Sequence, residues 1–337
     1  MTKRAASRSW PMVVALAAVC ALSSKEPAAQ TAKPPLTLET KIPLGGVAGR
    51  IDHMAIDLAR NRLFVAELGN NSVGVVDLTS RKVVHRIAGL KEPQGVAYAQ
   101  ATDTLYVATR GDGSLRIFRG QNYTPVARVE LDSDADNVRI DASAGQVIVG
   151  YGDGALAVID MANHRKIGSM PLKGHPESFQ LDPSSSDVFI NLPDVRALVV
   201  LDRVTGQVRN SWTVPYGGNF AMALDNEAQR VLSVFRDPAK LVAFSKKTGS
   251  VMEQVNTCSD VDDVFLDAAR KRIYTSCGEG FIDVRDASVT GYPRLDRLVT
   301  APGARTSLFV PDTSRLFLAV RGQAEEPAAI WVYKAPE

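Results

Sequence analysis

The sequence predicts an all-β fold, a single seven-bladed β-propeller with four antiparallel strands in each blade. Three observations lead to this prediction. A short polar turn between two apolar runs recurs at a nearly constant spacing, and each recurrence has room for four short β-runs. No segment beyond the N-terminal leader repeats its apolar residues with the 3.6-residue period of a helix. Four short strands per repeat of about 40–45 residues are typical of a propeller blade.

The recurring turn sets the number of blades. In most copies it begins with an aspartate, whose carboxylate we expect to accept the backbone N–H two residues further on. The intervals between successive turns are 43, 41, 41, 43, 42 and 45 residues, and the markers are Asp57, Gln100, Asp141, Asp182, Asp225, Asp267 and Asp312. The first copy places its strands at 51–57, 62–67, 72–78 and 82–89.

The two ends of the repeat region predict how the ring closes. The seventh copy ends at "AIWVYK" (329–334) without a fourth strand, whereas the apolar run 36–44 precedes the first copy and belongs to no repeat. We expect 36–44 to form the outermost strand of the last blade, within one propeller domain spanning 36–337. Closure of the ring removes the sheet edges that an open array would expose to aggregation.

The N-terminal segment has the pattern of a signal peptide. Lys3, Arg4 and Arg8 precede an apolar run of twelve residues, 11–22, which is too short to span a bilayer. We expect a signal peptide over 1–23 with cleavage near Ser23 and a disordered lead-in over 24–35. The protein is therefore expected to be periplasmic or secreted, with no membrane span after signal removal.

The charge balance weighs against nucleic-acid binding. The chain has 39 Lys and Arg against 37 Asp and Glu, and loss of the three basic residues of the leader leaves 36 against 37. A nearly neutral body offers no electrostatic footprint for a polyanion.

The repeats resemble a known family, the YVTN-type propeller repeats of exported bacterial proteins (the YncE-like group). The resemblance is carried by "RLFVAELGNNSVGVVDL" (62–78) and by "RKVVHRIAGLKEPQGVAY" (81–98), and it extends over 36–337. It implies the propeller fold, whereas members of the group have been linked to different roles.

Candidate site residues lie just before each innermost strand, where the loops of all blades meet at one mouth of the central channel. Five residues before the markers stand Asp52, Gly95, Asp136, Glu177, Phe220, Asp262 and Ser307, of which four are acids. Neighbouring positions add further polar side chains: Arg50, His53, Asn137, His175, Asp263 and Arg305. A position used only for packing would favour apolar residues, so this ring predicts an acidic, histidine-containing channel mouth.

Several interpretations of this mouth stay open. A divalent cation, with calcium as the simplest choice, suits an oxygen set of Asp52, Asp136, Glu177 and Asp262. Zinc or another transition metal suits a set that combines His53 and His175 with Asp136 and Asp262. Arg50 and Arg305 can clamp a carboxylate or phosphate, or they can pair with nearby acids in a solvated rim.

Two cysteines remain after the leader. Cys258 enters the innermost strand of the sixth blade and Cys277 ends the next strand, so antiparallel pairing brings both to the same rim. A structural disulfide, two free core residues and a thiolate metal site are the alternatives, in that order of preference.

The functional expectation is a non-enzymatic, monomeric binding or scaffold propeller that presents its mouth to a protein partner or small ligand. The alternative is a metal-dependent lactonase or hydrolase in which His53 or His175 shuttles protons, although propeller lactonases carry a Glu/Asn/Asp set of which only the acids are evident here. A third alternative is single-stranded DNA binding, known within the resembling group. No Gly-x-Ser-x-Gly, P-loop or His-Glu-x-x-His motif occurs.

Overall fold

The structure is a computed structural model that describes all residues except 4, 8, 11–32, 324–325 and 337. The chain divides into two units, 1–33 and 34–337. The described residues of the first unit form neither helix nor strand. The apolar core of the predicted signal peptide and its cleavage position at Ser23 lie outside the described residues, as does most of the predicted lead-in.

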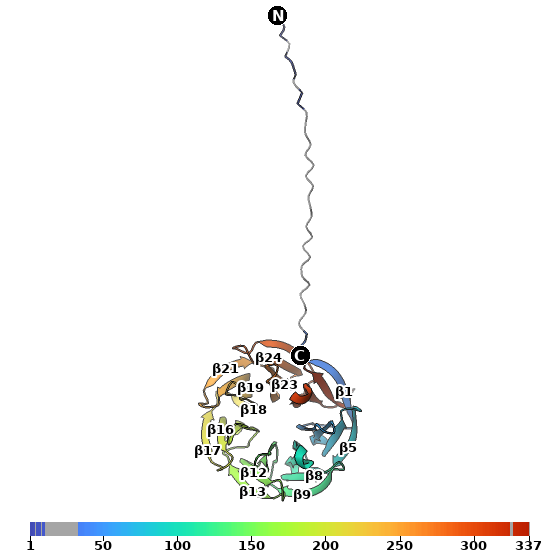
Figure 1. Ribbon diagram of the computed structural model, residues 1–337, viewed down its shortest axis with the longest axis vertical. Coiled ribbons are helices and arrows are strands. Elements are labelled where there is room, and N and C mark those ends of the chain that lie inside the picture. Colours follow the sequence, from blue (N-terminus) through green and yellow to red (C-terminus); the bar gives the residue numbers. More distant parts are fainter. Residues whose placement is uncertain (4, 8, 11–32, 324–325, 337) are drawn as a thin grey trace. The chain divides into compact units, whose positions relative to one another are not determined.

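The second unit is a seven-bladed β-propeller, as the sequence predicts. Seven antiparallel four-stranded sheets stand radially around a central channel (Figure 1). Neither α-helices nor long loops occur in the described part of this unit, where five single-turn 3₁₀ segments accompany the strands. None of the described helical segments has the length and apolar character to cross a membrane.

Each of the first six blades is built from four consecutive strands, of which the first lines the channel. Blades 1 to 3 comprise β2 (Met54–Asp57), β3 (Arg62–Glu67), β4 (Ser72–Asp77) and β5 (Lys82–Ala88); β6 (Pro93–Ala99), β7 (Thr104–Thr109), β8 (Ser114–Arg119) and β9 (Thr124–Glu130); and β10 (Val138–Asp141), β11 (Gln146–Tyr151), β12 (Ala155–Asp160) and β13 (Lys166–Pro171). Blades 4 to 6 comprise β14 (Ser178–Leu181), β15 (Asp187–Leu192), β16 (Ala197–Asp202) and β17 (Val208–Thr213); β18 (Gly217–Asp225), β19 (Arg230–Asp237), β20 (Ala239–Ser245) and β21 (Val251–Asn256); and β22 (Val261–Asp267), β23 (Arg272–Cys277), β24 (Phe281–Asp286) and β25 (Arg294–Val299).

Blade 7 takes strands from both ends of the propeller unit. It comprises β26 (Ser307–Val310), β27 (Arg315–Val320), β28 (Ala328–Lys334) and, as its outermost strand, β1 (Thr37–Gly45). Strand β1 pairs antiparallel with β28, with Ile42 opposite Ile330. The predicted closure by 36–44 is therefore confirmed to within one residue.

The recurring turns lie where the sequence predicts them, at the end of each innermost strand. Strands β2, β10, β18 and β22 end on the marker aspartates themselves. The hydrogen bonding differs in detail from the expectation. The carboxylates of Asp57, Asp141, Asp225 and Asp267 accept the N–H three residues further on, and only that of Asp182 accepts the N–H two residues on.

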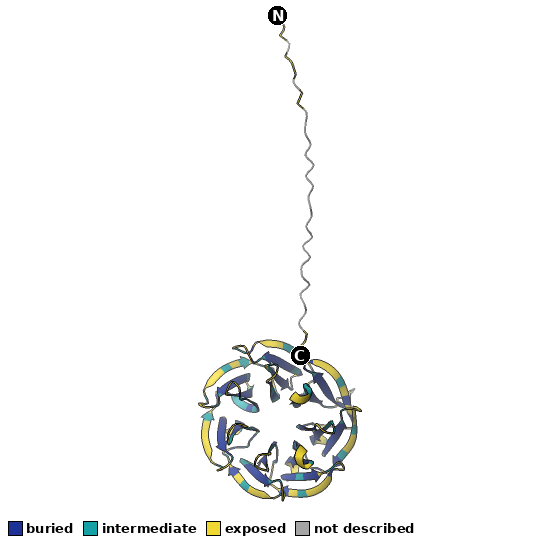
Figure 2. Cartoon of the chain, viewed as in Figure 1, coloured by how far each residue is buried: buried dark blue, intermediate teal, exposed yellow. Residues whose placement is uncertain are grey.

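The hydrophobic core is divided among the seven interfaces between adjacent blades. Each buried apolar cluster draws on two neighbouring sheets; the cluster between blades 7 and 1, for example, joins Ile42 and Leu44 of β1 to Leu63 and Val65 of β3. Residues facing these interfaces are buried, and exposed residues concentrate on the outer strands (Figure 2). The blades thus depend on each other for burial and form one cooperative ring.

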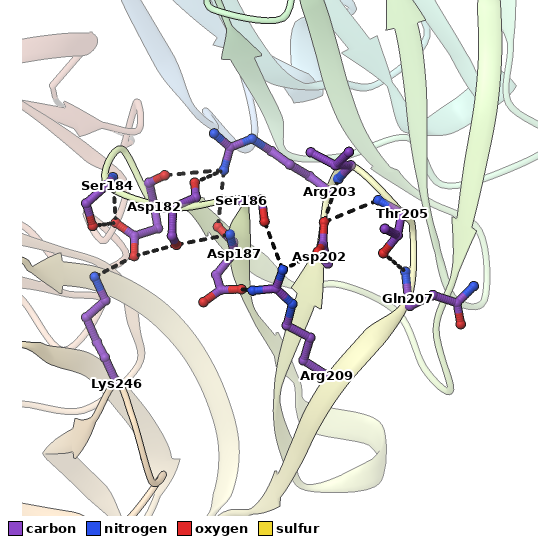
Figure 3. A network of polar contacts seen from close by, with 12 residues as sticks. Asp182, Ser184, Ser186, Asp187, Asp202, Arg203, Thr205, Gln207, Arg209 and Lys246 are labelled. Atoms are coloured by element: carbon purple, nitrogen blue, oxygen red, sulfur yellow. Dashed lines mark hydrogen bonds and ion pairs between the residues drawn. The ribbon is translucent and has the colours of Figure 1, made fainter.

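Ion pairs join the blades at the turn face, opposite the channel mouth. Lys246 of blade 5 lies 2.7 Å from Asp182 of blade 4, and Arg203 of blade 4 lies 2.6 Å from Asp141 of blade 3 (Figure 3 shows the network around Asp182). Burial raises the pKa of Asp182, but the hydrogen bond from Lys246 and bonds from nearby serines outweigh it and lower the pKa to about 2. This pair therefore stays ionised and reinforces the contact between blades.

Ring closure predicts that truncation of two aliphatic residues of equal size in β1 lowers the free energy of unfolding by very different amounts. Ile42 is fully buried against β28 and blade 1, whereas Leu38 is 42% exposed on the same strand. We expect Ile42→Ala to lower the free energy of unfolding by about 2–5 kcal/mol, because it leaves a cavity at the closure. Leu38→Ala is the matched control and should cost less than about 0.5 kcal/mol. Chemical denaturation followed by circular dichroism measures both; equal losses would contradict the role assigned to closure.

Candidate functional site

The candidate residues are gathered at one mouth of the channel by a repeated irregularity of the innermost strands. In blade 1 the N–H of Asp52 donates to the carbonyl of Ala66, whose own N–H donates to the carbonyl of His53. Asp52 and His53 thus both lie opposite the single residue Ala66, which defines a β-bulge. Bulges redirect side chains and often occur beside functional sites. The bulge explains why two consecutive side chains, rather than alternate ones, reach the channel mouth.

Blade 3 repeats this arrangement. Asp136 and Asn137 both bond the backbone of Gly150. Blade 2, which has Gly95 in place of an acid, shows why the pattern is interrupted there. A Cβ at Gly95 would lie 2.0 Å from the carbonyl oxygen of Asp136. The close approach of the Asp136 backbone therefore requires glycine in the neighbouring blade.

The structure brings the predicted site residues together. Eight of the ten line one narrow cavity of about 50 Å³: Arg50, Asp52, His53, Asp136, Asn137, Glu177, Asp262 and Asp263. The remaining two, His175 and Arg305, contact acids of this group. The cavity shares His53, Arg139 and Asp263 with a wider cavity of about 340 Å³ that is also lined by Val96 and Leu308. We call the narrow part the channel mouth and the wider part the channel chamber.

The predicted arginines of the mouth are held by acids. Arg50 lies 2.7 Å from Asp52, and Arg305 lies 2.5 Å from Asp260 and 2.9 Å from Asp262. Both guanidinium groups are therefore engaged within the protein, as in the self-paired alternative. Burial opposes the charge of Arg305, but Asp262 and Asp260 outweigh it and raise the pKa of this group.

A third arginine, which the sequence did not predict as a site residue, completes the pairing. Arg236, at the end of β19, forms an ion pair with Asp262 and donates a 2.8 Å hydrogen bond to the carbonyl of Val261. Its guanidinium lies 3.5 Å from the ring centroid of Phe220. Phe220, which breaks the acidic pattern in blade 5, thus serves as a cation–π platform for the arginine that neutralises the next blade.

Three carboxyl groups of the mouth resist ionisation. Asp52 is 1% exposed, and burial raises its pKa to about 6 despite the opposing charges of His53 and Arg50. Burial likewise raises the pKa of Asp263 to about 6. Burial, together with the charges of Asp136 and Asp262, raises the pKa of Glu177 to about 7. The mouth therefore holds several acids that a cationic or hydrogen-bond-donating group would stabilise in their charged form.

The two histidines of the mouth lie beside its carboxylates. One ring nitrogen of His175 lies 2.7 Å from the carbonyl oxygen of Gly152, and the other lies 3.9 Å from Asp136. Burial lowers the pKa of His175, but Asp136 and the Gly152 carbonyl outweigh it and raise the pKa to about 9. Burial also opposes the charge of His53, yet Asp52 and Asp263 raise its pKa. His53 Nε2 lies 3.7 Å from Asp52.

The acids do not converge as ligands of one metal ion. Over the described ranges of the chain, no group of three or more His, Cys, Asp or Glu side chains has a geometry that could hold a metal. Asp52 and Asp262 instead face arginines, and Asp136 faces His175. Neither the calcium set nor the zinc set expected from the sequence fits this arrangement.

A disulfide lies beside the acidic side of the mouth. Cys258 and Cys277 are bonded, with their Cα atoms 5.8 Å apart, and both are buried. The bond ties the end of β23 to the segment that leads through Asp260 into β22. It thereby restrains the segment that carries Asp260, one of the two carboxylates that pair with Arg305.

The sequence analysis missed two residues of the channel wall. Arg139 and Gln180 stand two residues before the markers Asp141 and Asp182, and both line the mouth and the chamber. A charged or amide side chain inside a four-residue apolar strand is the signal that marks them. In most other blades the comparable position is apolar, so no repeated polar pattern marks these two residues as the acids five residues before the markers are marked.

Comparisons with known proteins define the class of this protein as a seven-bladed β-propeller. A chain of Kuenenia stuttgartiensis hydrazine synthase superposes with a TM-score of 0.72 at 16% identity, over 81% of this chain and 94% of that one. A chain of the mitotic checkpoint complex superposes with a TM-score of 0.75 at 15% identity, over 97% of this chain and 99% of that one. These likenesses concern the fold alone.

No family model matches the chain, and no curated protein matches it. The resemblance to the YVTN-type, YncE-like repeats therefore stays a prediction from the sequence.

The raised pKa values predict that the protein loses stability as the pH rises. Asp52, Asp263 and Glu177 bind protons more tightly in the folded state than in the unfolded chain, so their contribution declines between about pH 4 and 7. His175 has a folded pKa of about 9 against an ordinary value of 6.5, so its contribution to stability is full below pH 6.5 and is lost as the pH approaches 9.

We therefore expect the wild-type protein to be less stable at pH 9 than at pH 6, by on the order of 2 kcal/mol from His175 alone. His175→Gln should flatten this difference, whereas His85→Gln, on the exposed strand β5, should leave it unchanged. Urea denaturation at both pH values measures the effect. A wild-type stability that increases from pH 6 to pH 9 would contradict the assigned shifts.

Removal of the disulfide provides a separate test of the rim. We expect the double variant Cys258→Ala/Cys277→Ala to lose about 3 kcal/mol, because the bond closes a segment with a sequence separation of 19. Thermal unfolding with and without a reductant measures the loss. The double variant should be insensitive to the reductant, and detection of two free thiols in the unreduced wild-type protein would show that the bond is absent.

Proposed function

We propose that this protein is an exported, non-enzymatic binding propeller that presents its acidic, histidine-containing mouth to a protein partner or small ligand. The export component rests on the signal-peptide pattern of residues 1–23. The binding component rests on the propeller, a fold that is consistent with a binding role, and on the chemistry of the mouth described above.

One observation carries the binding proposal. Asp136 is only 5% exposed, and its Oδ1 atom has no hydrogen-bond partner among the described residues. A buried carboxylate oxygen without a partner costs free energy, and such atoms in folded proteins call for a ligand, a water or an ion. Asp136 lines the mouth cavity, so a donor group entering the mouth can supply the missing bond.

The electrostatics of the mouth favour a ligand group that donates hydrogen bonds or carries positive charge. Burial and mutual repulsion raise the pKa values of Asp52, Asp263 and Glu177, which means that their charged forms are incompletely compensated by the protein. An ammonium or guanidinium group would relieve that repulsion. The partner is therefore expected to insert a basic side chain, or the ligand to carry an amine.

No specific observation favours the two other functions considered from the sequence. A metal-dependent lactonase needs converging metal ligands, and the described acids face arginine and histidine instead. Single-stranded DNA binding needs an extended basic surface, and the arginines of the mouth, Arg50 and Arg305, are paired with acids.

The proposal is tested by capture with matched variants. The wild-type protein and two variants, Asp136→Asn and His85→Gln, are immobilised and exposed to an extract of the compartment to which the protein is exported. Mass spectrometry then identifies the bound proteins and small molecules. We expect Asp136→Asn to weaken capture at least about tenfold, as for loss of one charged hydrogen bond, while His85→Gln retains it. Capture of the same molecules by all three proteins to the same extent would contradict binding through the mouth, and so would the absence of capture by any of them.

A further inference from the structure

We propose that the channel chamber binds a small amino carboxylate, a zwitterion whose carboxylate pairs with Arg139 and whose ammonium group pairs with Asp263. This inference rests on the proposed function and names the ligand class for that site. Arg139 and Asp263 both line the chamber as well as the mouth, so a single small molecule can reach both.

Arg139 supplies the cationic end of the site. It extends from the innermost strand of blade 3 and donates hydrogen bonds to the carbonyl of Val138 at 2.9 Å and to Gln180 Oε1 at 3.5 Å. A guanidinium group has five N–H donors, so donors remain for a ligand. Unlike Arg50 and Arg305, Arg139 forms no ion pair with any residue that the structure describes.

A carboxylate is the chemical partner that Arg139 lacks. Burial lowers the pKa of Arg139, and the more distant charges of Asp263 and Asp136 oppose this effect only in part. A guanidinium group nevertheless remains charged in proteins. Its removal from water therefore destabilises the folded protein until an anion pairs with it. The planar fork pairs with a carboxylate through two parallel hydrogen bonds.

Asp263 supplies the anionic end. Its Oδ2 atom accepts the N–H of Ser307 at 2.7 Å. Its Oδ1 atom lies 4.0 Å from His53 Nδ1, beyond hydrogen-bonding distance, and therefore remains available to a donor from the chamber. The carboxylate belongs to blade 6 and Arg139 to blade 3, so the two charges project into the chamber from different parts of the ring.

The chamber has the size and lining that such a ligand requires. Its volume of about 340 Å³ lies at the lower end of the range for small-molecule sites. Met54, Val96, Val138 and Leu308 form apolar parts of the chamber wall, against which a short hydrocarbon body can pack. The site therefore suits a molecule with two charged ends and a small apolar middle.

Charge balance distinguishes the zwitterion from simpler ligands. A plain carboxylate would satisfy Arg139 but would add negative charge next to Asp52, Glu177 and Asp263, whose pKa values are already raised in part by the charges of neighbouring carboxylates. A plain amine would satisfy Asp263 and leave Arg139 without an anion. Only a ligand with both groups compensates both ends without changing the net charge of the chamber.

The experiment compares matched ligands on the full protein by isothermal titration calorimetry. The panel contains unbranched aliphatic amino acids with the amino group at successive positions from the carboxylate, each with the matching carboxylic acid and the matching amine. We expect at least one amino acid to bind about tenfold or more tightly than either of its matched analogues. A carboxylic acid or an amine that binds as tightly as the amino acid would overturn the proposal, as would the absence of binding by the whole panel.

Variants then assign the binding to the two residues. Each of the variants Arg139→Gln and Asp263→Asn should lower the affinity for the tightest-binding amino acid by about tenfold or more. Arg119→Gln, at the exposed end of β8, should keep the wild-type affinity. Unfolding midpoints are measured in parallel, and Arg139→Lys, which keeps the charge but loses the planar fork, replaces the glutamine variant if that variant is destabilised. Wild-type affinity in Arg139→Gln would overturn the proposal.

The outcome separates this inference from the proposed function. Capture that depends on Asp136 without binding of any amino acid would overturn the zwitterion site alone. Failure of both experiments would overturn the binding function together with it.

Discussion

Closure of the ring is the constraint on which the rest of the structure depends. Strand β1 completes blade 7 by pairing with β28, and buried clusters then occupy every interface between neighbouring blades. Only a closed ring sets the innermost strands of all seven blades around one channel. The residues of the mouth are up to about 250 positions apart in the chain, from Arg50 to Arg305, and meet because the ring is complete.

The mouth concentrates charge in a place where water is limited, and its chemistry follows from that. Arginines from blades 1, 5 and 7 neutralise part of the acidic set through short contacts with Asp52 and Asp262. The uncompensated part appears as raised carboxyl pKa values and as a carboxylate oxygen of Asp136 without a partner. A protein that keeps such groups buried retains a region ready to accept a complementary donor.

Much of the fold could be predicted because the turns repeat. The marker aspartates fixed the blade count and the ends of the innermost strands, and the unpaired run 36–44 identified the closing strand. The positions of the acids were also accessible, because an acid in place of an apolar residue interrupts a strand pattern. Two arginines of the channel could not be predicted in this way. Arg236, the partner of Asp262, lies at the far end of a second strand, and Arg139 lies inside an innermost strand, where no repeat relates either of them to the acids.

The sequence by itself determined the architecture, because local periodicity and turn chemistry act over a few residues and recur in each blade. Tertiary structure alone decided which charges are neutralised. Whether Asp262 meets two arginines, or Arg139 meets none among the described residues, depends on rotations between blades and on the bulges that redirect consecutive side chains. Ion pairing and burial act across the channel between distant segments, and so no local pattern encodes them.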